Sequence, residues 1–202
     1  MDQSTPYKTI TREQFLFHEM RTTARLMQAG KTDEEIMKEI FDNNLFQFPT
    51  ERMVKNIASV CLRRLHALAS SEAVEIIADG SASSAKQACF YAIMLYYHLI
   101  WDFMSTVIAE KYRTKDFHYS RRDLNSFFTR LQEQSDEVAS WSDETIKKCK
   151  SVLTRMLIET EYLDSSKSEQ LNPILIDQEL KEIMLEKKDY ASLAAFNCFE
   201  EV

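Results

Sequence analysis

The longest apolar run in the chain is ACFYAIMLYYHLIW, which spans residues 88–101. It is interrupted only by His98, and Asp102 ends it well short of the ~20 apolar residues that a helix needs to cross a bilayer. Its Tyr and Trp residues are spread along the run, whereas membrane helices gather them at the two interfaces. The run therefore predicts the buried centre of a water-soluble fold, carried by a long helix or a kinked pair of helices from about residue 83 to residue 112.

Around this run, the composition favours helices throughout the chain. Two Gly and three Pro among 202 residues leave few turn-forming residues for β-sandwiches, barrels or dinucleotide-binding loops. A hydrophobic fraction of 45% is ordinary for a globular protein and argues against disorder. We expect an all-α, compact multi-helix bundle. Its N-terminal region is expected over residues 1–113 and its C-terminal region over residues 114–202, either separate or packed as a single domain.

Capping signals divide the region before the apolar run into helices. Thr11 and Gln14 have the spacing of a capping box, which predicts that a helix begins there. Thr50 precedes a longer helix over residues 51–68. On this longer helix the apolar residues share one side, and the opposite side is a polar stripe without any acid. That stripe consists of Arg52, Lys55, Asn56, Ser59 and Arg63.

The C-terminal region contains a second helix of this kind. Ser142 precedes a helix over residues 143–159 whose inner side is apolar. The outer side presents Lys147, Lys150, Ser151 and Thr154, flanked by Lys148 and Arg155. Residues 162–174, which contain a polar turn, predict a small β-hairpin behind this helix, and acidic helices are expected to finish the chain.

Both helices follow a shorter apolar helix and a tight turn, at residues 33–41 and at residues 123–132. This is the order of a helix-turn-helix, in which the second helix enters the major groove and a hairpin can contact the backbone as a wing. Arg, Lys, Asn, Ser and Thr are side chains that reach phosphates and base edges. The residues of the two stripes are therefore candidate DNA contacts. The alternative is that both stripes are ordinary solvated faces of a bundle.

The charge distribution limits this interpretation. The net charge is −7, which does not suit a high non-specific affinity for DNA. Acidic residues dominate after residue 160, whereas the segment 111–160 is slightly basic. Phosphate binding depends on where the cations lie on the surface, and the net charge does not contain that information.

No arrangement of residues in the sequence indicates catalysis, a cofactor or a metal. The cysteines are far apart and the histidines isolated, and phosphate-loop, dinucleotide-binding and nucleophile-elbow motifs are missing. We therefore expect no enzyme, no catalytic residue, no cofactor, no metal site and no small-molecule substrate. The N-terminal sequence MDQSTP has neither a basic region nor an apolar run. We expect no secretory signal, and hence a cytoplasmic protein with reduced cysteines.

Short motifs are spaced over most of the chain. They are EEI at 34–36, NNLF at 43–46, PTER at 49–52, RRL at 63–65, DGS at 79–81, AKQA at 85–88, DF at 102–103, EKYR at 110–113, WSDET at 141–145 and EYL at 161–163. In this order and spacing they resemble the BrxA family of BREX (bacteriophage exclusion) phage-defence systems. The resemblance implies a small all-α protein, similar in fold to NusB-type antitermination factors, with helix-turn-helix character and binding to double-stranded DNA. It also implies other BREX components as partners.

The stripes and the resemblance together predict a non-catalytic, DNA-binding accessory protein of a BREX-type system, with double-stranded DNA as partner and no membrane association. Two alternatives stay open. The first is a protein-interaction adaptor within the defence complex, which predicts a co-purifying partner and no DNA shift by the isolated protein. The second is an RNA-binding protein in the manner of NusB, which competition between duplex DNA and structured RNA would separate.

Overall fold

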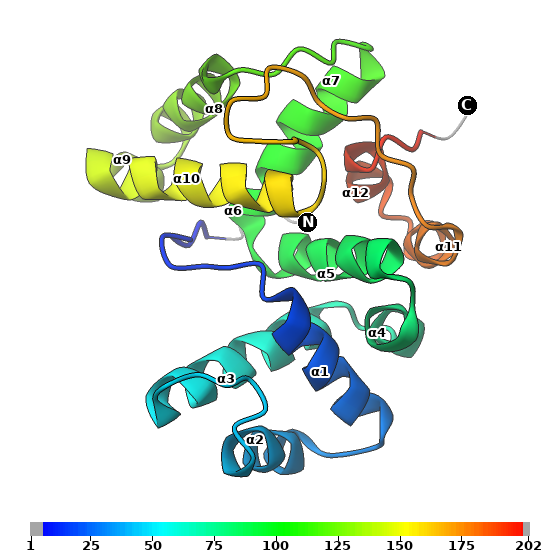
Figure 1. Cartoon of the computed structure of the whole chain (residues 1–202). Coiled ribbons are helices and arrows are strands. Elements are labelled where there is room, and N and C mark those ends of the chain that lie inside the picture. Colours follow the sequence, from blue (N-terminus) through cyan, green and yellow to red (C-terminus); the bar gives the residue numbers. More distant parts are fainter. Residues whose placement is uncertain (1–5, 200–202) are drawn as a thin grey trace. The chain divides into compact units, whose positions relative to one another are not determined.

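The structure is a computed structural model that describes residues 6–199 (Figure 1). This part of the chain contains no β-strand, and an isolated antiparallel bridge joins His118 to Gln170. The all-α prediction is therefore confirmed. The chain forms two compact units, each built from segments far apart in the sequence. We call them the α3 unit (residues 16–96 and 177–186) and the α10 unit (the described parts of 1–15, 97–176 and 187–202).

The α3 unit combines helices that bury one side with a central helix in which every residue from 88 to 94 is buried. These helices are α1 (Phe17–Gln28), α2 (Asp33–Asp42), α3 (Glu51–Ala67), α4 (Ser71–Asp79), α5 (Ala82–Tyr96) and α11 (Gln178–Glu186). Helix α3 packs against α1 and α5 and also against α2. The α2–α3 contact is a buried apolar cluster of Ile36, Ile40, Val54, Ala58 and Leu62. The Thr50 side chain accepts a hydrogen bond from the amide of Met53, so the predicted cap of α3 is confirmed.

The first helix begins later than its capping signal predicts. Helix α1 starts at Phe17, and both Thr11 and Gln14 lie before it. Phe15 is buried, and Leu16 adopts a left-handed conformation with φ of 60° and is also buried. Full burial of a large apolar side chain is worth roughly 1.5–3 kcal/mol, whereas a cap is worth about 1 kcal/mol. The predicted helix start at Thr11 is therefore wrong, because burial outweighs the local signal.

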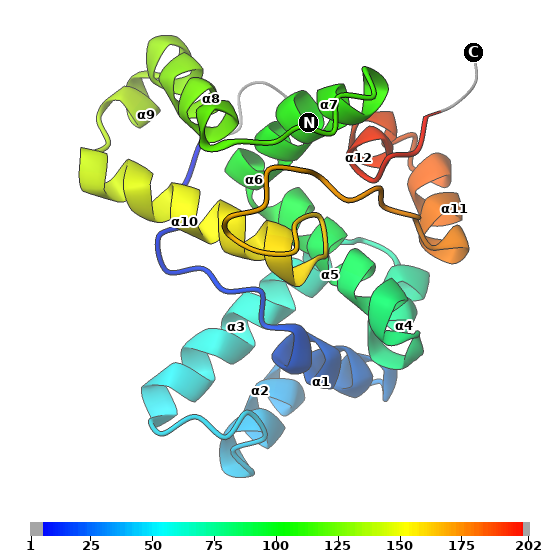
Figure 2. The same ribbon diagram turned by 45° about the horizontal axis from the view of Figure 1, so that its top comes forward.

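The α10 unit holds the second predicted stripe. Its helices are α6 (His98–Phe103), the π-helix η1 (Met104–Ile108), α7 (Ala109–Arg113), α8 (Arg121–Gln134), α9 (Asp136–Ala139), α10 (Asp143–Glu159) and α12 (Tyr190–Ala195). Helix α12 packs against α7 and η1. The Ser142 side chain accepts a hydrogen bond from the Thr145 amide, which confirms the predicted cap of α10. The chain after α10 passes along the C-terminal half of that helix (Figures 1 and 2).

The apolar run is largely buried, as predicted, and of the two expected forms it adopts the kinked pair of helices. Helix α5 ends at Tyr96, Tyr97 is extended with φ of −112° and ψ of 100°, and α6 begins at His98. Among the described helices, none is by itself both long enough and apolar enough to cross a membrane. The segments Ala82–Tyr96 and His98–Arg113 reach that requirement only when taken together.

The predicted β-hairpin behind α10 does not form. Residues 162–171 are a loop, and Glu169 and Leu171 hydrogen-bond to the segment 117–119 before α8, with N–O distances of 2.9 and 2.8 Å. The loop therefore pairs with the segment before α8, and its two expected arms share a backbone hydrogen bond from the Asn172 amide to the Tyr162 carbonyl at 3.0 Å. The cause is tertiary, because Tyr162 at the start of the loop is buried and its hydroxyl donates to a carbonyl of α12 at 3.0 Å. The wing is thus replaced by a loop beside α8 and α10.

Candidate nucleic-acid interface

The predicted stripe on α3 lies on the exposed side of that helix. Its members Arg52, Lys55, Asn56 and Arg63 are exposed, and Ser59 is half-buried. The ammonium of Lys55 lies 4.2 Å from the ring centroid of Phe41, and the guanidinium of Arg63 lies 5.9 Å from that of Tyr96. No carboxylate among residues 6–199 forms an ion pair with Arg52, Lys55 or Arg63. These three charges therefore stay available to an external anion.

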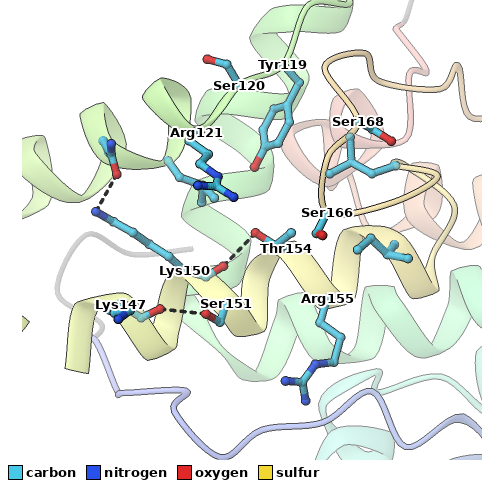
Figure 3. A pocket seen from close by; sticks show the side chains of 14 residues that line it. Tyr119, Ser120, Arg121, Lys147, Lys150, Ser151, Thr154, Arg155, Ser166 and Ser168 are labelled. Carbon is cyan, nitrogen blue, oxygen red and sulfur yellow. Dashed lines mark hydrogen bonds between the residues drawn. The ribbon is translucent and has the colours of Figure 1, made fainter. Parts of the chain in front are cut away.

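The predicted stripe on α10 divides into two parts. Lys147, Lys150, Ser151, Thr154 and Arg155 all line one pocket of about 550 Å³ (Figure 3). Lys148 does not line it. The ammonium of Lys148 lies 3.4 Å from the carboxylate of Glu144, one turn earlier on the same helix. Most of the stripe is thus part of a concave site, whereas the charge of Lys148 is partly compensated.

This pocket, which we call the α10 pocket, is enclosed by α8, α10 and the 162–171 loop. The other residues that line it are Tyr119, Ser120, Arg121, Leu124, Asn125, Ile158, Leu163, Ser166 and Ser168. None of the lining residues is acidic, and Arg121, Lys147, Lys150 and Arg155 are cationic. A pocket that is lined by several cations and by no acid attracts an anionic ligand.

Lys150 is the cation that is held most firmly. Its ammonium donates to the Asn125 side-chain carbonyl at 2.9 Å and lies 5.4 Å from the ring centroid of Phe128. Burial lowers the pKa of Lys150, and the distant carboxylate of Asp143 opposes this only in part. A nearby anion would offset the desolvation of the ammonium. By contrast, Arg121, Lys147 and Arg155 are exposed, with no ion pair to any carboxylate in the described range.

A second pocket of about 460 Å³ continues the basic surface across the start of α8. It shares Ser120, Arg121, Ser166 and Ser168 with the α10 pocket and adds His118, Arg122, Lys167 and Glu169. Arg122 and Lys167 are exposed. The amides at the start of an α-helix carry partial positive charge and point outward, which adds to the attraction for anions. The two pockets together extend the basic surface beyond the predicted stripe.

Sequence reasoning missed the contribution of α8 and the loop. Arg121 and Arg122 follow the capping box of Ser120 and Asp123, which the structure contains. That signal places two cations in the first turn of α8, but it does not show that this turn faces α10. The sequence did not indicate that Lys167 belongs to the site, because its position depends on a loop that the sequence predicts as a hairpin.

Other chemistries find little support in the fold. Across residues 6–199, no group of three or more His, Cys, Asp or Glu side chains could hold a metal ion. The four cysteines are free thiols; three are buried and Cys198 is half-buried. Burial raises the pKa of the Cys61 thiol to about 12, so it does not supply a thiolate nucleophile at neutral pH.

Comparison with known proteins identifies relatives over most of the chain. A BREX protein BrxA of Bacillus cereus (strain H3081.97) is 36% identical over 159 residues, which are 79% of this chain and 79% of that protein. The BREX protein BrxA of Escherichia coli O9:H4 (strain HS) is 25% identical over 166 residues, or 82% of this chain and 78% of that protein.

A solved structure supports the fold. The crystal structure of an uncharacterized protein from Magnetospirillum magneticum is similar, with a TM-score of 0.80 at 23% sequence identity over 95% of this chain and 98% of that one. Finally, the model of the family described as BrxA matches residues 6–188. With a family match over nearly its whole length and a close curated relative, the chain belongs to the BrxA family.

Proposed function

We propose that this BrxA protein is a non-catalytic accessory component of a BREX-type phage-defence system that acts in the cytoplasm by binding double-stranded DNA. The observation that carries the proposal is the acid-free cationic lining of the α10 pocket together with the cations around it. The names of its curated relatives support membership of a BREX system.

Electrostatics supports the binding of a polyanion despite the net charge of −7. Lys147 and Arg155 are exposed on α10, and Arg121 faces them from α8. Each phosphate that such a cation neutralises releases condensed counterions, which provides most of the free energy of non-specific DNA binding. Because the Debye length at physiological salt is about 8 Å, the local charge of this surface matters more than distant acidic residues.

The same proposal includes the helix-turn-helix interpretation. Helices α2 and α3 are joined by a turn and share an apolar cluster, and α3 presents the stripe of Arg52, Lys55 and Arg63 away from that cluster. In the α10 unit, α8 and the short α9 precede α10 in the same order. A second helix with an exposed polar face is the part that enters a major groove. We propose polar contacts from Asn56, Ser59, Ser151 and Thr154 beside those of the cations. Lys148 is expected to contribute least, because Glu144 lies beside it.

Charge reversal tests the proposal with fluorescence anisotropy of a labelled duplex. The Lys147→Glu, Arg155→Glu double variant is expected to weaken duplex binding by at least tenfold at low salt. The control is Arg113→Glu, Lys115→Glu, which changes the net charge equally within the same unit but touches neither pocket. Equal affinity of the two variants would remove α10 from the proposal. The parallel variant Arg52→Glu, Lys55→Glu, Arg63→Glu tests α3 in the same way.

A protein-interaction adaptor is the second candidate, and one observation favours it. Leu45 and Met53 are large apolar side chains exposed by 38% and 42% beside the α2–α3 turn, next to the α3 stripe. An adaptor would show no duplex binding by the isolated protein and would bind another BREX component through this surface. A NusB-like RNA binder would be revealed if structured RNA displaced the duplex at equal concentration.

A further inference from the structure

The hydroxyl of Tyr119 has an unusual environment in the α10 pocket. Tyr119 is 4% exposed, and its hydroxyl oxygen is buried without a hydrogen-bond partner among residues 6–199. A buried polar group without a partner costs about 1–3 kcal/mol, and native proteins rarely leave one unsatisfied. The phenol group points into the α10 pocket, toward the side of α10 that carries Thr154 (Figure 3). The pocket therefore presents a hydroxyl that is satisfied only by something entering it.

The cations around the pocket define the charge of that occupant. Arg121 from α8, together with Lys150 and Arg155 from α10, lines the same space, and no acidic residue does. Burial and the carboxylate of Asp123 raise the pKa of Tyr119, so its hydroxyl stays protonated and can donate. Figure 3 shows the Arg121 side chain on the same side of the pocket as the Tyr119 hydroxyl, whereas Lys150 extends toward Asn125 and Arg155 points away. A guanidinium beside a phenolic donor is a pair of groups that binds a phosphate with several oxygens.

The size and walls of the pocket define the rest of the occupant. Its volume of about 550 Å³ is far more than a single phosphate fills and lies within the range of ~300–1,000 Å³ typical of small-molecule sites. Leu124, Ile158 and Leu163 form an apolar wall of the pocket beside the polar groups. An occupant that satisfies both parts carries a phosphate at one end and a group with apolar faces at the other.

We propose that the α10 pocket binds one nucleoside monophosphate unit, with its phosphate at Tyr119 and Arg121 and its base against Leu124, Ile158 and Leu163. A free mononucleotide and the 5′-phosphorylated end of a DNA strand offer the same chemistry. The phosphates within a continuous duplex do not, because each is flanked by two sugars and cannot enter a recess with its base. The inference goes beyond duplex binding and does not depend on it.

Isothermal titration calorimetry on the whole 202-residue chain tests the proposal with five probes. They are deoxyadenosine monophosphate, deoxyadenosine, inorganic phosphate, and a single-stranded hexanucleotide with or without a 5′-phosphate. Saturable binding of the mononucleotide, at least tenfold tighter than of the nucleoside or of inorganic phosphate, is the expected result. Equal binding of mononucleotide and inorganic phosphate would reduce the site to an adventitious anion site and overturn the proposal. A preference for the phosphorylated hexanucleotide over the mononucleotide would assign the strand end as the source, and the reverse would assign the free nucleotide.

Variants of the lining test the residues. Tyr119→Phe is expected to weaken mononucleotide binding about tenfold, as is Arg121→Gln, because each removes one hydrogen bond to a charged group. Arg113→Gln, whose side chain lines neither pocket, is the control and keeps wild-type affinity. Wild-type affinity in both Tyr119→Phe and Arg121→Gln would overturn the proposal. Circular dichroism of each variant confirms that it is folded before its affinity is interpreted.

The two proposals fail separately. If the protein binds the mononucleotide but not a blunt, unphosphorylated duplex, the proposed function is wrong and the proposed pocket ligand is supported. Protein that binds such a duplex but no mononucleotide overturns the pocket ligand alone.

Discussion

Replacement of Tyr119 by Phe separates a ligand-binding role of the hydroxyl from a structural one. In the free protein this hydroxyl is buried without a partner among the described residues, so its removal relieves a desolvation cost. We predict that Tyr119→Phe raises the free energy of unfolding by about 1 kcal/mol, the lower end of the penalty for an unsatisfied buried group. Such a gain in stability with a loss of binding is the usual trade-off at functional sites.

Tyr162→Phe is the matched control, because it removes the same atom from a satisfied position in the same unit. The Tyr162 residue is 1% exposed, and its hydroxyl donates to the carbonyl of Ala195 at 3.0 Å. Its loss leaves that carbonyl without this donor, and we predict destabilisation by about 1–2 kcal/mol. Urea unfolding followed by circular dichroism measures both values through the midpoint and its slope. A loss of stability in Tyr119→Phe as large as that in Tyr162→Phe would refute the reasoning.

Two further predictions concern the stability of the fold. Gly80→Ala should destabilise by roughly 1–3 kcal/mol in urea unfolding, because a Cβ at Gly80 would clash with the backbone carbonyl of Ile76; unchanged stability would contradict this close approach. His98 stacks on Trp101 and contacts the tilted ring of Tyr7, and burial lowers its pKa, an effect that Asp102 only partly opposes. Its stabilising effect is therefore complete above the unfolded-state pKa of about 6.5 and is lost as the pH falls through the folded-state value. Between pH 7.5 and pH 5.5, the unfolding midpoint of the wild type should accordingly fall further than that of His98→Phe. Equal changes in the two proteins would refute this prediction.

Much of the helical architecture could be predicted from the sequence, because the signals involved are local. Thr50 and Ser142 cap helices that begin where the sequence places them, and the apolar sides of α3 and α10 are buried. These features depend on residues within one or two turns of each other, and the periodicity of the chain records them directly. The scarcity of Gly and Pro was informative for the same reason.

The incorrect predictions share a tertiary cause. Phe15 is buried where the capping signal at Thr11 predicts a helix, so the helix begins later. The hairpin does not form, because the loop after α10 pairs with the segment before α8. The sequence allowed a kinked pair of helices, but the break at Tyr97 lies in a run without Gly or Pro, so no local breaker gives its position. For the hairpin, the competing hydrogen bonds come from residues distant in sequence, which periodicity does not report.

The candidate site follows the same division. Helical spacing alone placed Lys147 and Arg155 on the outer side of α10. The pocket itself also depends on Tyr119, which lies before α8, and on Arg121 in the first turn of α8. It further depends on a loop whose path the sequence did not indicate. The sequence thus predicts a basic face on α10, and in the structure that face lines the α10 pocket together with α8 and the loop.

The salt dependence of duplex binding tests the central claim most directly. For the wild type, the logarithm of the association constant should fall linearly with the logarithm of the salt concentration, with a slope near −0.9 for each phosphate neutralised. Lys147→Glu, Arg155→Glu should make that slope shallower by about 1.8, since two phosphate contacts are lost. Arg113→Glu, Lys115→Glu should leave it unchanged. A wild-type affinity that is independent of salt, or equal slopes in all three proteins, would contradict DNA binding by the α10 surface.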